Sequence, residues 1–561
     1  MNEKGEYIVT CNGVILKKDI DDVHYIDLEY RTGRKKNVII SIKDFGTSVY
    51  KLSKRVKDLL EIAGYLFAAD RESSRGKPDN VEYHSWSRCF HIHIKVRDYK
   101  FWNAPEIKYL LSDILCFITG DKEYKFTFYK GDIDFPTNLF DTEKFVLDTK
   151  KNISIALFSG GLDSLAGIIE RLETTKDEIC LVSHQSGQPS VMQTQNNLYE
   201  SIKKSYPDRC KHYKFHCGLS HTKSVDETQR TRAFLFTSMA FAIASTYKQD
   251  KIFVYENGIT SLNFAKTQDM MNGRASRTTH PQTIALLEKL FTKIVEKDFK
   301  IEHPFLFKTK TDVVKGLKGH KKLGLLDSSV SCSATRNRPP EKKTHCGVCS
   351  QCIDRRFAVY SSSTERYDEN GIYHFNFLKD DLENPTTIKS LVDYIRLAQS
   401  FAEENEDAFY MNRPDQIAEI DEYLEGKTEQ ERVNKLYDLC KRHSRDIENA
   451  IQRMREIHDK PLARYNPKSF FNLIVGPREY QNPEKVIING KEKLKTFKRG
   501  ELKKELNKYI DEFKLKDGVT VRTKTSALIT RKLIAEGWNA NERSVAVTLR
   551  KMGYGEELQK Y

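Results

Sequence analysis

The sequence has no apolar stretch long enough to cross a membrane, and its first residues do not predict a secretory leader. A spanning helix needs about 20 consecutive apolar residues, whereas the uncharged run from Ala233 to Tyr247 has 15 and contains Thr and Ser. The N-terminal MNEKGEYIVTCNG has no apolar signal-peptide core. These absences argue against membrane and secreted classes, so we expect a cytoplasmic protein with no membrane partner.

The composition also argues against a disulfide scaffold and against a disordered chain. Thiols stay reduced in the cytoplasm, so the 11 cysteines are not expected to pair as disulfides. With 39% hydrophobic and 31% charged residues, the chain has the composition of a globular protein. Its 561 residues are too many for a single core, which predicts several domains.

Positive charge is concentrated in the last part of the chain. The formal net charge is +14, and residues 491–561 alone carry 18 Lys/Arg against 10 Asp/Glu. A basic balance of this kind favours an acidic partner, with nucleic acid as the usual one. A solvated lysine-rich surface explains the same composition, and charge alone does not decide between the two.

Strand and helix patterns divide the chain into four regions. Residues 1–148 alternate apolar and polar positions and predict a strand-rich α+β domain. In residues 149–365 strands alternate with helices, which indicates a doubly wound parallel α/β sheet. Residues 366–485 are helical and charged. In residues 486–561 a helix over Ser526–Glu536, a Gly537 turn and a helix over Asn541–Met552 are typical of a winged-helix-like module.

The second region opens with an anion-binding turn. In ISIALFSGGLDSLAGIIERLE (153–173) an uncharged strand passes through Ser159–Ser164 into an amphipathic helix. Gly160 and Gly161 let the backbone approach a phosphate closely, while the helix presents free N–H groups and its positive dipole end. Asp163 fits such a site as a Mg²⁺ ligand or through its backbone. A Walker A loop is excluded, because its GxxxxGK[ST] lysine is missing.

The turn resembles the SGGxDS pyrophosphate loop of the N-type ATP pyrophosphatases. That resemblance implies that ATP is cleaved between its α- and β-phosphates to give an adenylated substrate and pyrophosphate. It assigns catalysis to Asp163, Ser159 and Ser164. It assigns nucleotide binding to Phe158, Ser159, Gly160, Gly161, Leu162, Asp163 and Ser164, and to Gln188 in SHQSGQ.

A second motif lies about 170 residues later, where four cysteines fall within 21 residues. Cys332, Cys346, Cys349 and Cys352 have the spacing Cys-x13-Cys-x2-Cys-x2-Cys. Four thiolates with two tight Cys-x2-Cys steps are the donor set of a tetrahedral zinc site. A closed site of this kind leaves no position for water, which predicts structural Zn²⁺.

Together, the loop and the cysteine string resemble the QueC family of 7-cyano-7-deazaguanine synthases. Shorter matches follow in family order at SHQSGQ, at Arg232, at VYENGITSLN with Asn257, and at PFLFKTKTDVVKGL with Lys308 and Lys310. The resemblance implies adenylation of the carboxylate of 7-carboxy-7-deazaguanine followed by attack of an amine. It makes Arg232, Asn257, Lys308 and Lys310 candidates for the substrate end. The tyrosine of the family's YGQ segment is Ser186 here.

The resemblance covers only residues 152–362, leaving long flanking regions. Enlarged chains of this build resemble QueC-like proteins of bacterial anti-phage operons of the Qat and CBASS types. For those the resemblance implies a protein N-terminal amine, encoded nearby, as the acceptor in place of ammonia. Two alternatives stay open: a pyrophosphatase that modifies tRNA or DNA delivered by the basic module, and a nucleotide-gated scaffold without enzymatic activity. The module could equally dock a protein, and a homodimer is also left open.

Overall fold

The computed structural model describes residues 5–16, 23–31, 36–41, 52–74, 87–131, 152–185, 189–220, 225, 230–264, 277–333, 343–376, 378–382, 385–424, 426, 428–459, 466, 468–475, 501–512, 523–536, 538, 540, 545, 548, 549 and 552. The chain divides into two compact units, Met1–Val475 and Gly476–Tyr561, each of which is described by itself. Among the described residues, no helix combines the length and apolarity that a membrane span requires. The boundaries that the sequence suggests after residues 148, 365 and 485 stay predictions.

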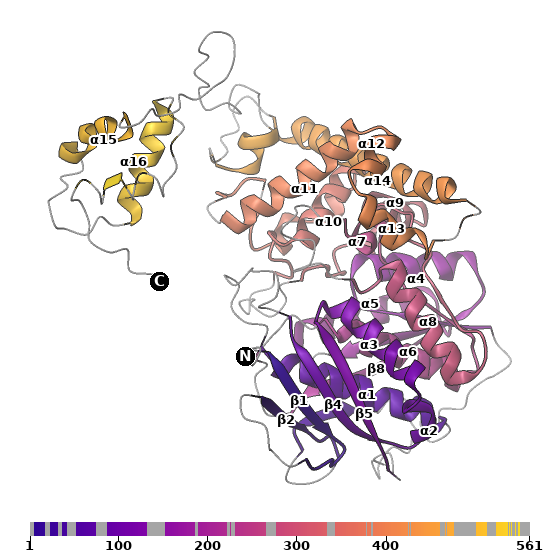
Figure 1. The fold of residues 1–561 in the computed structure, drawn as a ribbon. Coiled ribbons are helices and arrows are strands. Elements are labelled where there is room, and N and C mark those ends of the chain that lie inside the picture. Colours follow the sequence, from indigo (N-terminus) through magenta and orange to yellow (C-terminus); the bar gives the residue numbers. More distant parts are fainter. Residues whose placement is uncertain are drawn as a thin grey trace. The chain divides into compact units, whose positions relative to one another are not determined.

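The first unit contains a six-stranded sheet in the order β10-β9-β6-β7-β8-β3. Figure 1 labels its strand β8, and it also labels the strands β2, β1, β4 and β5 of a second sheet. The strands of the six-stranded sheet are β3 (Val38–Ser41), β6 (Ile153–Leu157), β7 (Glu178–Gln185), β8 (Cys210–Leu219), β9 (Lys251–Phe253) and β10 (Lys300–Glu302). All neighbours pair in parallel except β3, which runs antiparallel to β8. The predicted parallel α/β sheet is confirmed, and its edge strand comes from the N-terminal region.

Helices cover both faces of this sheet. The core of one face includes side chains from α4 (Leu162–Thr174), α5 (Pro189–Ser205) and α9 (Lys310–Gly319). The core of the other face includes side chains from α6 (Arg232–Thr246) and α8 (Pro281–Val295). The chain runs from β6 through β7 to β8 and then returns to place β9 on the other side of β6. Ligands of doubly wound sheets bind at such a switch point, beyond the carboxyl ends of the strands.

A second, four-stranded sheet has the order β2-β1-β4-β5, and all its strands are parallel. It contains β1 (Glu6–Cys11), β2 (His24–Leu28), β4 (Cys89–Val96) and β5 (Glu123–Lys130). Its inward side chains, Val9, Ile92 and Phe126 among them, share one core with helices of both sheets. The helices of this region are α1 (Lys54–Glu72), α2 (Tyr99–Trp102) and α3 (Pro105–Thr119).

The region after the six-stranded sheet is helical, as its sequence predicts. Its elements are α10 (Ser350–Ser361), α11 (Pro385–Glu403), α12 (Glu406–Met411), α13 (Pro414–Asp421), α14 (Glu429–His458) and a π-helix (Phe471–Val475). Phe357 of α10 packs in one core with Leu391 of α11 and Ala450 of α14. The short helix α7 (Gly258–Leu262) is packed against this bundle through Leu262.

The second unit contains α15 (Glu501–Glu512) and α16 (Thr523–Ala535). Its small core includes Leu506, Tyr509, Ile529 and Leu533. The helix expected over Ser526–Glu536 corresponds to α16 and is confirmed to within a few residues. The second helix expected over Asn541–Met552 lies largely outside the described residues.

Candidate active site and zinc centre

The predicted ATP loop lies at the switch point, between the carboxyl end of β6 and the N-terminus of α4. Phe158 continues the sheet, since its N–H donates to the carbonyl oxygen of Val182 at 2.7 Å. Gly160 has a φ of +82°, in the left-handed region that favours glycine. Gly161 is the N-cap of α4 and provides no side-chain cap. The N–H groups of the first turn therefore receive no cap from Gly161, and uncapped N–H groups at a helix N-terminus can bind an anion.

Two serine hydroxyls close the loop on itself. Ser159 Oγ accepts from the N–H of Gly161 at 3.2 Å and lies 3.2 Å from Ser164 Oγ. The Ser164 hydroxyl donates to the carbonyl oxygen of Gly161 at 3.0 Å. Both hydroxyls thus lie at the helix N-terminus and hold the loop in shape before any ligand arrives.

Residues of helix α5 contact the ATP loop and support it. The side-chain amide of Gln195 donates to the carbonyl oxygen of Ser159 at 3.3 Å. A Cβ built on Gly160 would lie 3.3 Å from both Gln195 Cγ and Thr194 Cγ2. Sequence analysis did not identify this support, because no motif marks Thr194 or Gln195.

Gly160→Ala is therefore expected to weaken ATP binding. The alanine would have to keep a φ of +82° and push against α5, a strain of about 1–3 kcal/mol. We expect roughly 5- to 100-fold weaker nucleotide binding, measurable by calorimetry. Gly324→Ala is the matched control, since no atom lies within 4 Å of its added Cβ. Unchanged affinity of Gly160→Ala would contradict the assigned loop geometry.

Asp163 is the centre of a buried charge cluster. Its Oδ2 accepts from Lys310 Nζ at 2.8 Å and from Asn257 Nδ2 at 3.1 Å. Lys310 is the first residue of α9, and Asn257 is the N-cap of α7. Burial raises the pKa of Asp163, but the charge of Lys310 and the hydrogen bonds from Glu256, Lys310 and Asn257 together outweigh burial and hold that pKa at about 2. Three of the predicted site residues, distant in sequence, therefore come together in space.

Two further acidic residues belong to the same cluster and were missed from the sequence. Asp354 Oδ2 lies 3.9 Å from Lys310 Nζ. Glu256 adjoins Asn257, and burial together with the Asp163 carboxylate raises the pKa of Glu256 well above its ordinary value. Lys310 Nζ lies between the two carboxylates, and Glu256 also hydrogen-bonds to Asp163. Carboxylate oxygens are the donors that Mg²⁺ prefers, so a magnesium ion here would share them with Lys310 and Glu256.

The remaining substrate candidates lie apart from this cluster. Lys308 Nζ pairs with Glu170 at 2.7 Å, further along α4. Arg232 is half-buried at the start of α6, where burial lowers its pKa. It lies near His184, whose pKa is lowered by burial and by that guanidinium. Gln188 lies outside the described residues, so its nucleotide role stays a prediction.

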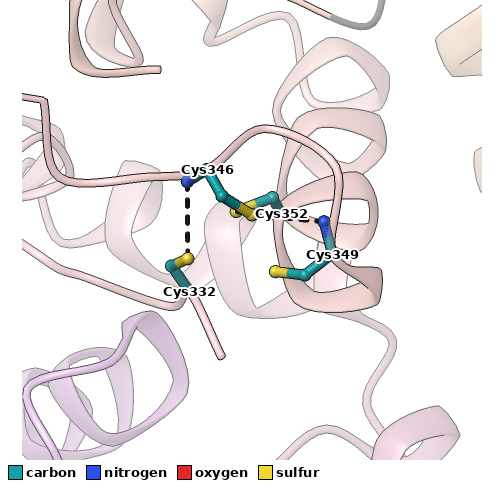
Figure 2. A group of neighbouring side chains, drawn as sticks. All are labelled: Cys332, Cys346, Cys349 and Cys352. Atoms are coloured by element: carbon teal, nitrogen blue, oxygen red, sulfur yellow. Dashed lines mark hydrogen bonds between the residues drawn. The ribbon is translucent and has the colours of Figure 1, made fainter. Parts of the chain in front are cut away.

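The four clustered cysteines converge in the structure (Figure 2). Their Sγ atoms all lie within 4.8 Å of one another, and Cys332 and Cys352 are buried. The backbone N–H of Cys346 points to Cys332 Sγ at 3.4 Å, and that of Cys349 points to Cys346 Sγ at 3.3 Å. Four convergent thiolates with N–H groups directed at the sulfurs fit a closed tetrahedral Zn²⁺ site.

Gly347 makes the tight turn between two of these cysteines. Its φ is +85°, and an added Cβ would lie 1.8 Å from the carbonyl oxygen of Phe375. Cys349 then serves as the N-cap of α10, which carries Asp354. The zinc segment and the Asp163 cluster are therefore parts of one packed structure.

A parallel α/β sheet with a glycine-serine loop at its switch point and a four-cysteine cluster is the arrangement expected of a PP-loop fold. Residues 219–362 match the family model described as queuosine biosynthesis protein QueC, so the chain contains a QueC-family domain. The match covers about a quarter of the chain, includes all four cysteines and begins after the ATP loop. No curated protein matches the chain. The QueC match points to ATP-dependent PP-loop chemistry, and the cysteine cluster fits structural zinc.

Proposed function

We propose that this protein uses ATP to join 7-carboxy-7-deazaguanine to an amine. The substrate carboxylate oxygen attacks the α-phosphorus, and the bond to the β-phosphate breaks to release pyrophosphate. The amine then attacks the acyl carbon, AMP leaves, and the amine loses a proton. The observation that carries this proposal is the Asp163–Lys310–Asn257 cluster beside the SGGLDS loop in a chain with a QueC-family domain.

The loop residues supply the binding and polarisation that this reaction requires. Backbone N–H groups at the start of α4 and the hydroxyl of Ser159 can donate to the phosphates, and the Ser164 hydroxyl can do so once it turns from the Gly161 carbonyl oxygen. Asp163 would hold a magnesium ion bound with the triphosphate, which supplies positive charge to the departing pyrophosphate. Lys310, fixed between Asp163 and Asp354, keeps a second positive charge within the same region.

Arg232 is our candidate for contact with the substrate carboxylate. No ion pair to its guanidinium is found within the described residues, and its pKa is already lowered by burial. A half-buried guanidinium without an ion pair among these residues is costly, and an incoming carboxylate would relieve that cost. This contact would also distinguish the carboxylic acid from neutral deazaguanines.

Arg232→Ala is therefore expected to raise KM for the acid more than it lowers kcat. Loss of a charge-assisted hydrogen bond to the substrate corresponds to about 10- to 100-fold in kcat/KM. Initial rates of pyrophosphate release at varied acid concentration measure it. Arg230→Ala is the neighbouring control, because Arg230 donates to the carbonyl oxygen of Thr119. Equal kinetics for Arg232→Ala and wild type would exclude this assignment.

The amine is the open part of the proposed reaction. Ammonia would give the free amide, while a protein N-terminal amine would give a conjugate, as the resemblance to anti-phage chains implies. The match leaves 218 residues before it and 199 after it in the chain of 561, which is room for domains that bind a protein acceptor. Mass spectrometry after incubation with ATP, the acid and either ammonia or neighbouring operon proteins distinguishes the two. A mass increase on a protein favours the conjugate and a defence role, and a small-molecule amide favours ammonia.

The basic C-terminal unit favours a second candidate function, modification of tRNA or DNA. Residues 491–561 carry a net charge of +8, and they fall within a compact unit of their own. Deletion of residues 476–561 is then expected to abolish salt-dependent nucleic-acid binding, with pyrophosphate release from the small substrate retained. Filter binding at several salt concentrations measures it. Equal binding by the full chain and the truncated chain would remove this candidate.

A further inference from the structure

Ser331, next to the first cysteine of the zinc cluster, lies directly on the ATP loop. Its Oγ accepts from the N–H of Leu162, the first residue of α4, at 3.3 Å across 169 positions of sequence. The preceding residue also contacts the loop, since the N–H of Val330 donates to the carbonyl oxygen of Gly160 at 2.9 Å. Two consecutive residues of the zinc segment thus bond to the two ends of the glycine turn.

The α4 helix has no N-cap side chain to accept a hydrogen bond from its first N–H groups. The hydroxyl of Ser331 accepts such a bond instead. Helices commonly bond their first N–H groups through a Ser, Thr, Asp or Asn at the N-cap, whereas this cap residue is Gly161. A serine hydroxyl has one donor and two acceptor lone pairs. While Ser331 Oγ accepts from Leu162, its O–H can still donate to an anion at the same helix end.

Independent contacts fix Ser331 in this position. Its own N–H points to His345 Nε2 at 3.4 Å, and the adjacent Cys332 belongs to the four-cysteine cluster. Ser329 is held by the Arg355 guanidinium, which donates to Ser329 Oγ at 2.8 Å. Both Arg355 and Ser329 are fully buried. The segment therefore has little freedom to move away from the loop.

A second feature at this helix end is a buried carboxylate. Asp163, the second residue of α4, is bonded to Lys310 and Asn257, and its side chain also hydrogen-bonds to Glu256. A carboxylate at this place fits a cation that accompanies a polyphosphate. Donors for phosphate and an acceptor for its counter-ion thus meet at one point.

We propose that Ser331 is a further nucleotide-binding residue, whose hydroxyl contacts the β- or γ-phosphate of ATP and whose position is set by the cysteine cluster. This inference rests on the proposed use of ATP at the loop. It extends the ATP site beyond the SGGLDS motif to a residue of the zinc segment. It also explains physically why the metal centre lies beside the active site although it has no part in the chemistry.

Calorimetry with an ATP analogue that carries a methylene bridge between the α- and β-phosphates tests this inference, with AMP as the second ligand. Ser331→Thr keeps the hydroxyl, and Ser331→Val has the shape of the threonine variant without the hydroxyl. We expect Ser331→Val to bind the analogue on the order of 10-fold or more weakly. Its AMP affinity and zinc content are expected to match those of Ser331→Thr. Ser328→Ala, an exposed position in the same segment, controls for general effects of substitution.

Two results would overturn the inference while leaving the proposed function intact. Equal analogue affinity of the valine and threonine variants would show that the hydroxyl makes no phosphate contact. If Ser331→Val lost AMP affinity to the same extent as analogue affinity, Ser331 would have a role in loop stability alone. Failure of the wild-type protein to bind the analogue would instead contradict the proposed use of ATP.

Discussion

Asp163→Asn is expected to reduce pyrophosphate release on the order of 100-fold or more. The variant is expected to keep its fold in the absence of ATP. The amide keeps the size of the carboxyl group and can still accept a hydrogen bond from Lys310. It cannot supply the negative charge that a magnesium ion requires. A coupled assay of pyrophosphate release in the presence of the deazaguanine acid measures the effect.

The same substitution also changes stability, because it separates a buried ion pair. Asp163 and Lys310 are 5% and 3% exposed, and removing one partner of such a pair costs about 3–5 kcal/mol. Asp354 and Glu256 remain near Lys310 and can offset part of that cost. An alanine at position 163 would add a cavity, so asparagine is the cleaner test.

A double variant separates the two effects of Asp163. In Asp163→Asn/Lys310→Met both charges of the pair are removed, so thermal stability is expected to recover relative to Asp163→Asn. Pyrophosphate release is expected to stay low. Near-normal release by either variant would contradict the assigned role of Asp163.

Cys349→Ser is expected to abolish zinc binding and to unfold the segment that contacts the ATP loop. Structural zinc sites contribute apparent binding free energies of about 10–16 kcal/mol that act as folding free energy. Cys349 is also the N-cap of α10, whose buried Arg355 and Asp354 reach toward the loop region and the Asp163 cluster. Zinc content by mass spectrometry and thermal unfolding measure the two effects together.

Cys116→Ser provides the matched control for the loss of zinc. Cys116 lies in α3, outside the cysteine cluster, and is half-buried. We expect its variant to keep full zinc content and to bind nucleotide normally. A stable, nucleotide-binding Cys349→Ser protein without zinc would contradict the structural role of the metal.

The parts of the site that could be predicted from sequence are those encoded by local spacing. Residues 159–164 form one turn between a strand and a helix, and Cys346, Cys349 and Cys352 are separated by two residues each. Short-range geometry decides both arrangements. The alternation of strands and helices likewise predicted the parallel strands of the six-stranded sheet.

The parts that could not be predicted depend on which distant side chains meet. Lys308 and Lys310 are two residues apart and equally basic, yet one pairs with Glu170 on α4 and the other with the buried Asp163. Neither Asp354 nor Ser331 belongs to a motif on its own. Each becomes part of the site because the zinc segment packs against the loop.

The sequence pattern also did not predict which strands pair with one another. An apolar-polar alternation predicts a strand with one buried face but does not specify its neighbour. Thus β3 joins the six-stranded sheet antiparallel to β8, while β1, β2, β4 and β5 form a parallel sheet of their own. Long-range packing through α1 and α6 decides this arrangement.

The most direct test of the account is pyrophosphate release by the purified full-length protein with ATP, Mg²⁺ and 7-carboxy-7-deazaguanine. We predict release that requires the acid and that is lost in Asp163→Asn. Release that is independent of the acid, or absent in the presence of every amine supplied, would contradict adenylation of this carboxylate at the SGGLDS loop.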